Sequence, residues 1–221
     1  VYGRDENNSV GKQGLNGWIF ALLTLDTMGY KTPEGAEFDR ERILDEIVSS
    51  QNTDGGFSLS KGESDIDITA MALQAIAPYY NDFSRDDVRK SVDKAVEYLS
   101  GKQDSFGTFG SAEADSQVVI ALCSLGIDPE ADSRFVKSSD PLTALLSYQN
   151  SDGGFSHEKG GDSDELATGQ ALCALAAQKR FELTMRRIYD MREELSVLQR
   201  EKLDGITVSY THLTLPTTSR V

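Results

Sequence analysis

The stretch QNTDGGFSLS, residues 51–60, recurs almost unchanged as QNSDGGFSHE at residues 149–158. A weaker copy, QDSFGTF, occupies residues 103–109 and keeps the glutamine, one glycine and the phenylalanine. The three glutamines, Gln51, Gln103 and Gln149, follow one another at intervals of 52 and 46 residues. A period of this length indicates a repeat architecture, because each unit has room for two helices and their loops.

The segments before and after each copy differ in character. Those before it are amphipathic with a charged face: DRERILDEIVSSQ (39–51), DDVRKSVDKAVEYLSGKQ (86–103) and DPLTALLSYQ (140–149). Those after it are apolar nearly all round: DIDITAMALQAIAPYY (65–80), EADSQVVIALCSLG (113–126) and SDELATGQALCALAAQ (163–178), with NGWIFALLTLDTMG (16–29) as an earlier one. Outer helices with one polar face therefore alternate with buried inner helices, which predicts an all-α fold of stacked hairpins, either a solenoid or a closed α/α barrel.

The charge balance excludes some partners. The chain has 22 Lys and Arg against 36 Asp and Glu, a net charge of −14. Nucleic acids and anionic membrane surfaces attract clustered basic residues, so we expect no nucleic-acid partner. No apolar run approaches the roughly 18 residues of a membrane-spanning helix, so we expect no transmembrane segment.

The Q-x-x-x-G-x-F turn, followed by an inner helix such as DIDITAMAL (65–73), resembles the prenyltransferase and squalene-oxidase repeat of terpenoid cyclases and protein prenyltransferase β subunits. The resemblance covers residues 12–180 and implies an α/α toroid that is incomplete, with about four helical hairpins. It also implies that the turn is a structural clamp, in which the glutamine binds helix-end backbone groups, glycine permits the turn and the aromatic residue packs between layers. The clamp residues are Gln51, Gly55, Phe57, Gln103, Gly107, Phe109, Gln149, Gly153 and Phe155.

Asp65 and Asp67 are the candidate catalytic residues. By resemblance they match the first two acids of the D-x-D-D-T-A-M-A-L segment of class II terpene cyclases, in which a carboxylic acid protonates an alkene or epoxide; Ile68 occupies the place of the last acid. Such an acid must be kept protonated by an apolar site and a neighbouring carboxylate. The alternative is that both acids cap a helix and complement its dipole. Acids near the other inner-helix starts, Asp115 and residues 162–164, favour that alternative.

We therefore expect a non-catalytic ligand-binding or structural module of an exported bacterial protein. The alternative is a class II terpene cyclase relative that uses Asp67 as its general acid. The inner helices carry few aromatic residues that could stabilise carbocations, namely Trp18, Phe20, Tyr79 and Tyr80. Bacterial surface proteins with similar repeats imply an extracellular or cell-surface location. The similar barrel of cobalamin carriers implies, by analogy, a small corrinoid-like ligand at the concave mouth, and we expect no tightly held cofactor.

No metal site is expected. The only histidines, His157 and His212, have no Cys, Asp or His partner at the spacing of zinc ligands. Asp54 and Asp152 could each offer calcium one carboxylate, but an Asx turn explains both Asp-Gly-Gly sequences without an ion.

Cys123 and Cys173 follow the same Ala-Leu dipeptide on two inner helices. If they occupy equivalent places, their helix axes lie about 8–10 Å apart. A disulfide requires Cα atoms within about 7 Å of each other. We therefore expect two buried free thiols and no disulfide.

The two ends of the chain differ from the repeats. We expect residues 1–11 to be the edge of a fragment, because the chain begins with Val1 and not with Met, so the absence of a signal peptide is uninformative. Residues 181–207 are densely charged with apolar residues at coiled-coil-like spacing, which predicts a helix, either a fourth outer one or foreign sequence. Residues 208–221 contain VSYTHLTLPT, which matches a translated transposase adaptor for sequencing libraries. We interpret them as a disordered artefact and exclude them, with His212, from the function.

Overall fold

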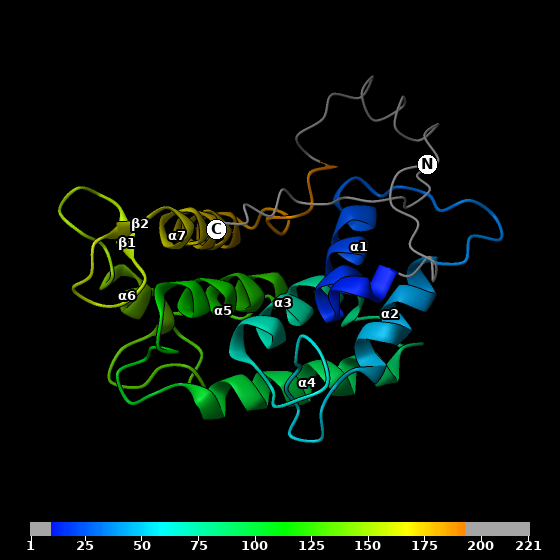
Figure 1. Cartoon of the computed structure of the whole chain (residues 1–221), viewed down its shortest axis with the longest axis horizontal. Coiled ribbons are helices and arrows are strands. Elements are labelled where there is room, and N and C mark those ends of the chain that lie inside the picture. Colours follow the sequence, from blue (N-terminus) through cyan, green and yellow to red (C-terminus); the bar gives the residue numbers. More distant parts are fainter. Residues whose placement is uncertain (1–9, 193–221) are drawn as a thin grey trace.

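The computed structural model describes residues 10–192 and shows alternating inner and outer helices (Figure 1). The inner helices are α1 (Leu15–Thr27), α3 (Ile66–Ile76), α5 (Ala112–Leu125) and α7 (Glu165–Glu182). The outer helices are α2 (Arg40–Ser49), α4 (Asp86–Lys102) and α6 (Pro141–Leu146). Two short 3-10 helices, η1 (Val10–Gln13) and η2 (Ala77–Tyr79), and a small antiparallel sheet of β1 (Phe155–Ser156) and β2 (Ser163–Asp164) complete this part. The predicted all-α class is confirmed.

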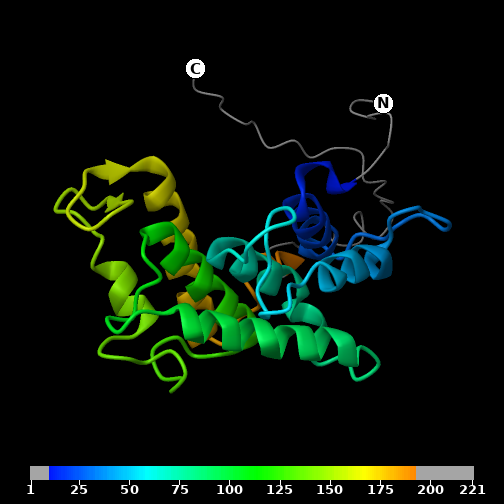
Figure 2. The same ribbon diagram turned by 60° about the horizontal axis from the view of Figure 1, so that its bottom comes forward.

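The inner helices pack side by side in chain order, α1 on α3, α3 on α5 and α5 on α7. Each of the first three also packs against the outer helix that follows it, so that α2, α4 and α6 lie on the outside. Figure 2 shows α4 running along one face of the molecule, in front of the inner helices. Within residues 10–192, no helix is long and apolar enough to span a membrane.

The middle inner helix, α5, explains why the inner segments are apolar all round. Val118 and Leu122 of α5 belong to a core cluster shared with α1 to α4. Val119 and Ile120, on its other side, belong to a second cluster shared with α6 and α7. The helix therefore buries apolar side chains against both neighbours, and a polar stripe would have no solvent to face.

The last inner helix, α7, is buried on one side only. Ala171 and Ala174 pack against α5, whereas Leu172 is 59% exposed. Cys173 is exposed as well, so the expectation of two buried thiols is wrong for this residue, because nothing in residues 10–192 covers the far side of α7. Cys123 is half-buried on α5, and burial raises the pKa of its thiol to about 12. Both cysteines are free thiols.

The three Q-x-x-x-G-x-F turns share one geometry. In each, the glutamine amide donates to the carbonyl of the turn's first glycine, and the first two glutamines also reach a carbonyl of the next hairpin. The bonds run from Gln51 to Gly55 O and Ser91 O (both 2.8 Å), from Gln103 to Gly107 O (2.9 Å) and Phe135 O (2.8 Å), and from Gln149 to Gly153 O (3.2 Å). Gly55, Gly107 and Gly153 have φ angles of 90°, 91° and 90°, which favour glycine. Phe57, Phe109 and Phe155 are buried.

The charged helix expected over residues 181–207 is absent from residues 183–192. Helix α7 ends at Glu182 in a Schellman motif: Thr184 has φ 53°, its N–H bonds to Phe181 O, and the Met185 N–H reaches Arg180 O. The chain then crosses the C-terminal ends of the inner helices, where the N–H of Met191 donates to Thr27 O at 2.9 Å. Residues 1–9 and 193–221, including the predicted artefact, lie outside the described part.

Candidate functional site

The two candidate acids have different surroundings. Asp65 is the N-cap of α3, and its carboxylate accepts the N–H of Ile68 at 2.9 Å. Asp67, in the first turn of the same helix, is half-buried. Its Oδ1 is enclosed and has no hydrogen-bond partner among the described residues. Capping therefore accounts for Asp65 but not for Asp67.

Negative charges gather around Asp67. Glu113 lies in the first turn of the neighbouring helix α5, and its Oε2 is 2.8 Å from Nδ1 of His157. Burial, together with the charges of Asp65 and Glu113, raises the pKa of Asp67 to about 6, and His157 opposes the shift. Burial beside like charges is what holds a carboxylic acid protonated near neutrality, as proton donation to a weak base requires.

The repeat register accounts for the carboxylates at these helix starts. The N-caps of α3, α5 and α7 are Asp65, Ser111 and Asp164. Two residues after them come Asp67, Glu113 and Leu166, and four residues after them come Thr69, Asp115 and Thr168. Asp115 thus lies in the first turn of α5, as expected, but two residues beyond the position equivalent to Asp67. The position of Asp67 carries an acid on two adjacent inner helices and a leucine on the third.

Asp115 instead holds the middle turn. It is fully buried, and its Oδ1 accepts the N–H of Phe109 at 2.5 Å and the hydroxyl of Thr108 at 3.0 Å. Thr69 and Thr168 accept the corresponding phenylalanine N–H in the other two turns. Burial raises the pKa of Asp115 to about 7. Its role is structural, because its bonded partners belong to the turn.

Three glutamines link the inner helices on the C-terminal side of the acids. Gln74 of α3 donates to Oε1 of Gln117 of α5 at 2.8 Å, and Gln117 donates to Oε1 of Gln170 of α7 at 3.0 Å. Gln74 follows Asp67 by seven residues, or about two helical turns, so both lie on one face of α3. That face carries the acid at its N-terminal end and the amide row toward its C-terminal end.

The described residues offer little to bind a metal ion. Among residues 10–192, no group of three or more His, Cys, Asp or Glu side chains is arranged as a metal site. His157 is paired with Glu113. Asp54 and Asp152 each accept the N–H two residues further on, at 3.0 Å, and a serine hydroxyl, so both are used within their turns.

Comparison with known proteins identifies the family. The model of the prenyltransferase alpha-alpha toroid domain matches residues 7–204. The chain belongs to this family. A solved structure, Candida albicans protein geranylgeranyltransferase-I complexed with GGPP, superimposes with a TM-score of 0.56 at 18% identity, over 89% of this toroid chain and 57% of that chain. The likeness shows the same fold, and the predicted incomplete α/α toroid is confirmed.

A curated relative of the toroid chain is an enzyme. Drimenyl diphosphate synthase of Streptomyces showdoensis is 33% identical over 143 residues, which make up 61% of this chain and 26% of that enzyme. The toroid chain thus spans about a quarter of this relative. The likeness contradicts the expectation of a non-catalytic module and favours the alternative, a terpene cyclase relative.

The sequence pointed to Asp65 and Asp67 but not to Glu113, and it indicated that His157 has no partner at the spacing of zinc ligands. The signal for Glu113 was present, because aligning the repeats on their helix caps places it level with Asp67. The pairing of Glu113 with His157 had no such signal, since 44 residues separate them.

Proposed function

We propose that this toroid supplies the proton donor of a class II terpene cyclase, with Asp67 as general acid and an isoprenoid diphosphate as substrate. The observation that carries the proposal is the enclosed, unpartnered carboxyl oxygen of Asp67, whose pKa is about 6. The name of the Streptomyces showdoensis relative supports the substrate class, because its product is still a diphosphate.

The chemistry follows from the position of the proton. The Asp67 carboxyl gives its proton to one carbon of a terminal alkene, so that a C–H bond forms and the adjacent carbon becomes a cation. An internal double bond then supplies the electron pair for a ring C–C bond, and loss of a proton from the final cation restores a double bond. The diphosphate C–O bond takes no part, so the product keeps its diphosphate.

The departure from the D-x-D-D pattern fits this role. Ile68 stands where the last acid of the pattern would be and is 9% exposed. An isoleucine at this position packs into the core and brings no further charge to the helix start. Desolvation then contributes more to the raised pKa than like-charge repulsion alone.

The test uses the product of the complete gene. Incubated with farnesyl or geranylgeranyl diphosphate, it is expected to yield a cyclic diphosphate, detected by gas chromatography and mass spectrometry after dephosphorylation. Asp67→Asn should lower turnover by about a thousandfold, because it removes the transferable proton. Asp164→Asn is the matched control, since asparagine also caps a helix. Absence of any cyclised product with the unaltered protein would reject the proposal.

Two further expectations remain predictions. An isoprenoid diphosphate is proposed here in preference to a corrinoid-like ligand, which rested on analogy of fold alone. The extracellular or cell-surface location rests on family resemblance, and fractionation of cells that express the complete gene would test it.

A further inference from the structure

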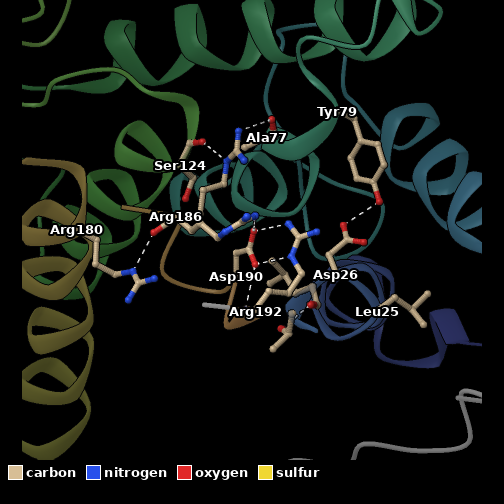
Figure 3. A network of polar contacts seen from close by, with 12 residues as sticks. Leu25, Asp26, Ala77, Tyr79, Ser124, Arg180, Arg186, Asp190 and Arg192 are labelled. Atoms are coloured by element: carbon tan, nitrogen blue, oxygen red, sulfur yellow. Dashed lines mark hydrogen bonds and ion pairs between the residues drawn. The ribbon is translucent and has the colours of Figure 1, made fainter. Parts of the chain in front are cut away.

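A cavity of about 380 Å³ lies at the C-terminal ends of the inner helices, the end opposite Asp67. Residues of α1, α2, α3, η2 and α5 and of the segment 183–192 line it. Figure 3 shows the polar contacts that several of these residues make. Its charged lining consists of Asp26, Arg40, Arg187, Asp190 and Arg192. The volume falls within the range of small-molecule sites in proteins.

Two carboxylates of the cavity already have partners. Asp26 accepts Nε of Arg40 at 2.7 Å and the hydroxyl of Tyr79 at 2.8 Å. Asp190 is shared by Arg192 and by Arg186, whose Nη1 lies 3.2 Å from it (Figure 3). Each carboxylate is therefore bonded to at least one arginine.

Arg187 is the exception. Its Nε donates to Ser124 O at 2.5 Å and its Nη2 to Ala77 O at 3.3 Å, and both acceptors are neutral backbone carbonyls. The side chain is half-buried, and burial lowers the pKa of its guanidinium. No carboxylate among residues 10–192 forms an ion pair with Arg187, and the charges of Asp190 and Asp26 only partly offset its desolvation. A desolvated and unpaired charge is costly, so an anion in the cavity would be stabilised by this group.

We propose that the cavity binds a phosphoryl oxyanion through Arg187, with Arg40 and Arg192 beside it, and that this anion is the diphosphate of the isoprenoid substrate. Guanidinium groups bind phosphate oxygens through pairs of parallel hydrogen bonds. The net charge of −14 repels anions from the surface at large, so saturable binding requires a local site of this kind.

The assignment to the substrate rests on the proposed function and on the geometry of α3. Asp67 and Gln74 lie on one face of this helix, and Gln74 also lines the cavity. Ala77, whose carbonyl Arg187 holds, follows Asp67 by ten residues, which corresponds to about 15 Å along a helix. An extended isoprenoid chain of several units spans a distance of this order. A diphosphate bound by Arg187 at the C-terminal end of α3 would place the distal alkene of the isoprenoid chain near Asp67 at the N-terminal end.

Isothermal titration of the 221-residue chain with inorganic pyrophosphate tests the site. Saturable binding is expected, and Arg187→Gln should weaken it by about tenfold or more, because glutamine keeps an N–H donor for a carbonyl and loses the charge. Arg89→Gln is the matched control on the outer helix α4, where Arg89 pairs with Asp86, and it should leave the affinity unchanged. Asp26→Asn keeps an acceptor for Tyr79, removes a competing charge and should tighten binding by about tenfold.

Several outcomes would overturn the site. These are no saturable binding, or equal weakening by Arg187→Gln and Arg89→Gln. Thermal melts verify folding, and if Arg187→Gln does not fold, the tightening by Asp26→Asn decides.

Binding and turnover separate this inference from the proposed function. Asp67→Asn should bind pyrophosphate like the unaltered chain. A prenyl thiodiphosphate should bind more tightly than pyrophosphate, and equal affinities would overturn the assignment to the substrate. In the complete gene product, an unchanged KM in Arg187→Gln would overturn the site, whereas pyrophosphate binding without any turnover would reject only the cyclase function.

Discussion

The helix cap of α3 and the proposed proton donor are neighbouring carboxyl groups with different surroundings. Asp65 and Asp67 are two residues apart, yet the helix N-terminus supplies the N–H of Ile68 to the first only. Asp67 is left with an enclosed oxygen and the charge of Glu113 nearby. Its free energy in the ionised form is therefore raised, which is the property a general acid needs.

The pH dependence of turnover is predicted from this group. Because the pKa of Asp67 is about 6 and the protonated form is active, kcat/KM should be highest below about pH 6 and fall about tenfold per pH unit above it. Glu113→Gln removes a negative charge and should move the midpoint to lower pH. A profile measured on the complete gene product that is flat between about pH 5 and 8, or that moves upward in Glu113→Gln, would contradict this role.

At the scale of the element, the residue four positions after the N-caps of α3, α5 and α7 accepts a hydrogen bond from the preceding turn. Thr69 and Thr168 do so with a hydroxyl, and Asp115 does so with a carboxyl whose Oδ2 has no partner among the described residues. The middle repeat therefore makes the same bond with a group that is costly to ionise in the core.

Asp115→Thr is expected to stabilise the chain. The pKa of Asp115 rises from 3.8 to about 7 in the folded state, so the folded state binds the proton more tightly. Protonated Asp115 therefore contributes to the free energy of unfolding at acidic pH, and this contribution is lost as the pH rises through about 7. At about pH 8 the threonine variant should gain about 1–2 kcal/mol in the free energy of unfolding, measured with urea, and a smaller gain is expected near pH 5.

Asp115→Ala is the control for this exchange. It removes the same charge but also leaves the N–H of Phe109 without its acceptor, so it should be less stable than Asp115→Thr. Equal stability of the two variants would show that the turn does not depend on this bond.

The helices also show which features of the fold could be predicted from the sequence. Apolar periodicity and turn residues predicted the inner helices and α4, because both signals are local. The end of α7 was missed, since Thr184 adopts the left-handed conformation without the glycine that usually marks it. The cavity could not be predicted either, because Asp26 and Arg187 belong to distant segments that meet only after residues 183–192 leave the helix.

At the scale of the whole molecule, the inner helices form a stack whose members differ in burial. Helix α5 contributes to both core clusters, while α7 contributes to one. The described part is thus a run of hairpins. One side of its last inner helix, α7, packs against α5, and the other side is exposed among the described residues. The chain spans 57% of the toroid structure it resembles.

Two adjacent residues of α7 should differ in how strongly a change of side-chain volume alters the free energy of unfolding. Ala171 is fully buried against α5, so Ala171→Leu should cost about 1–3 kcal/mol through overpacking. Leu172 is 59% exposed, so Leu172→Ala should change the free energy of unfolding by no more than about 0.5 kcal/mol. Urea denaturation of the 221-residue chain measures both. A larger cost for Leu172→Ala would mean that α7 presents a different face to α5.

The glutamine clamp has a consequence for how such proteins diversify. Its acceptors on the following hairpin, at Ser91 and Phe135, are main-chain oxygens, so mutation of either side chain leaves the joint intact. Duplicated copies can drift apart in sequence while remaining fastened to one another. One copy can then gain an acid such as Asp67 while a sister copy keeps Leu166 at the same place. Reactivity can arise in a single repeat without disturbing the others.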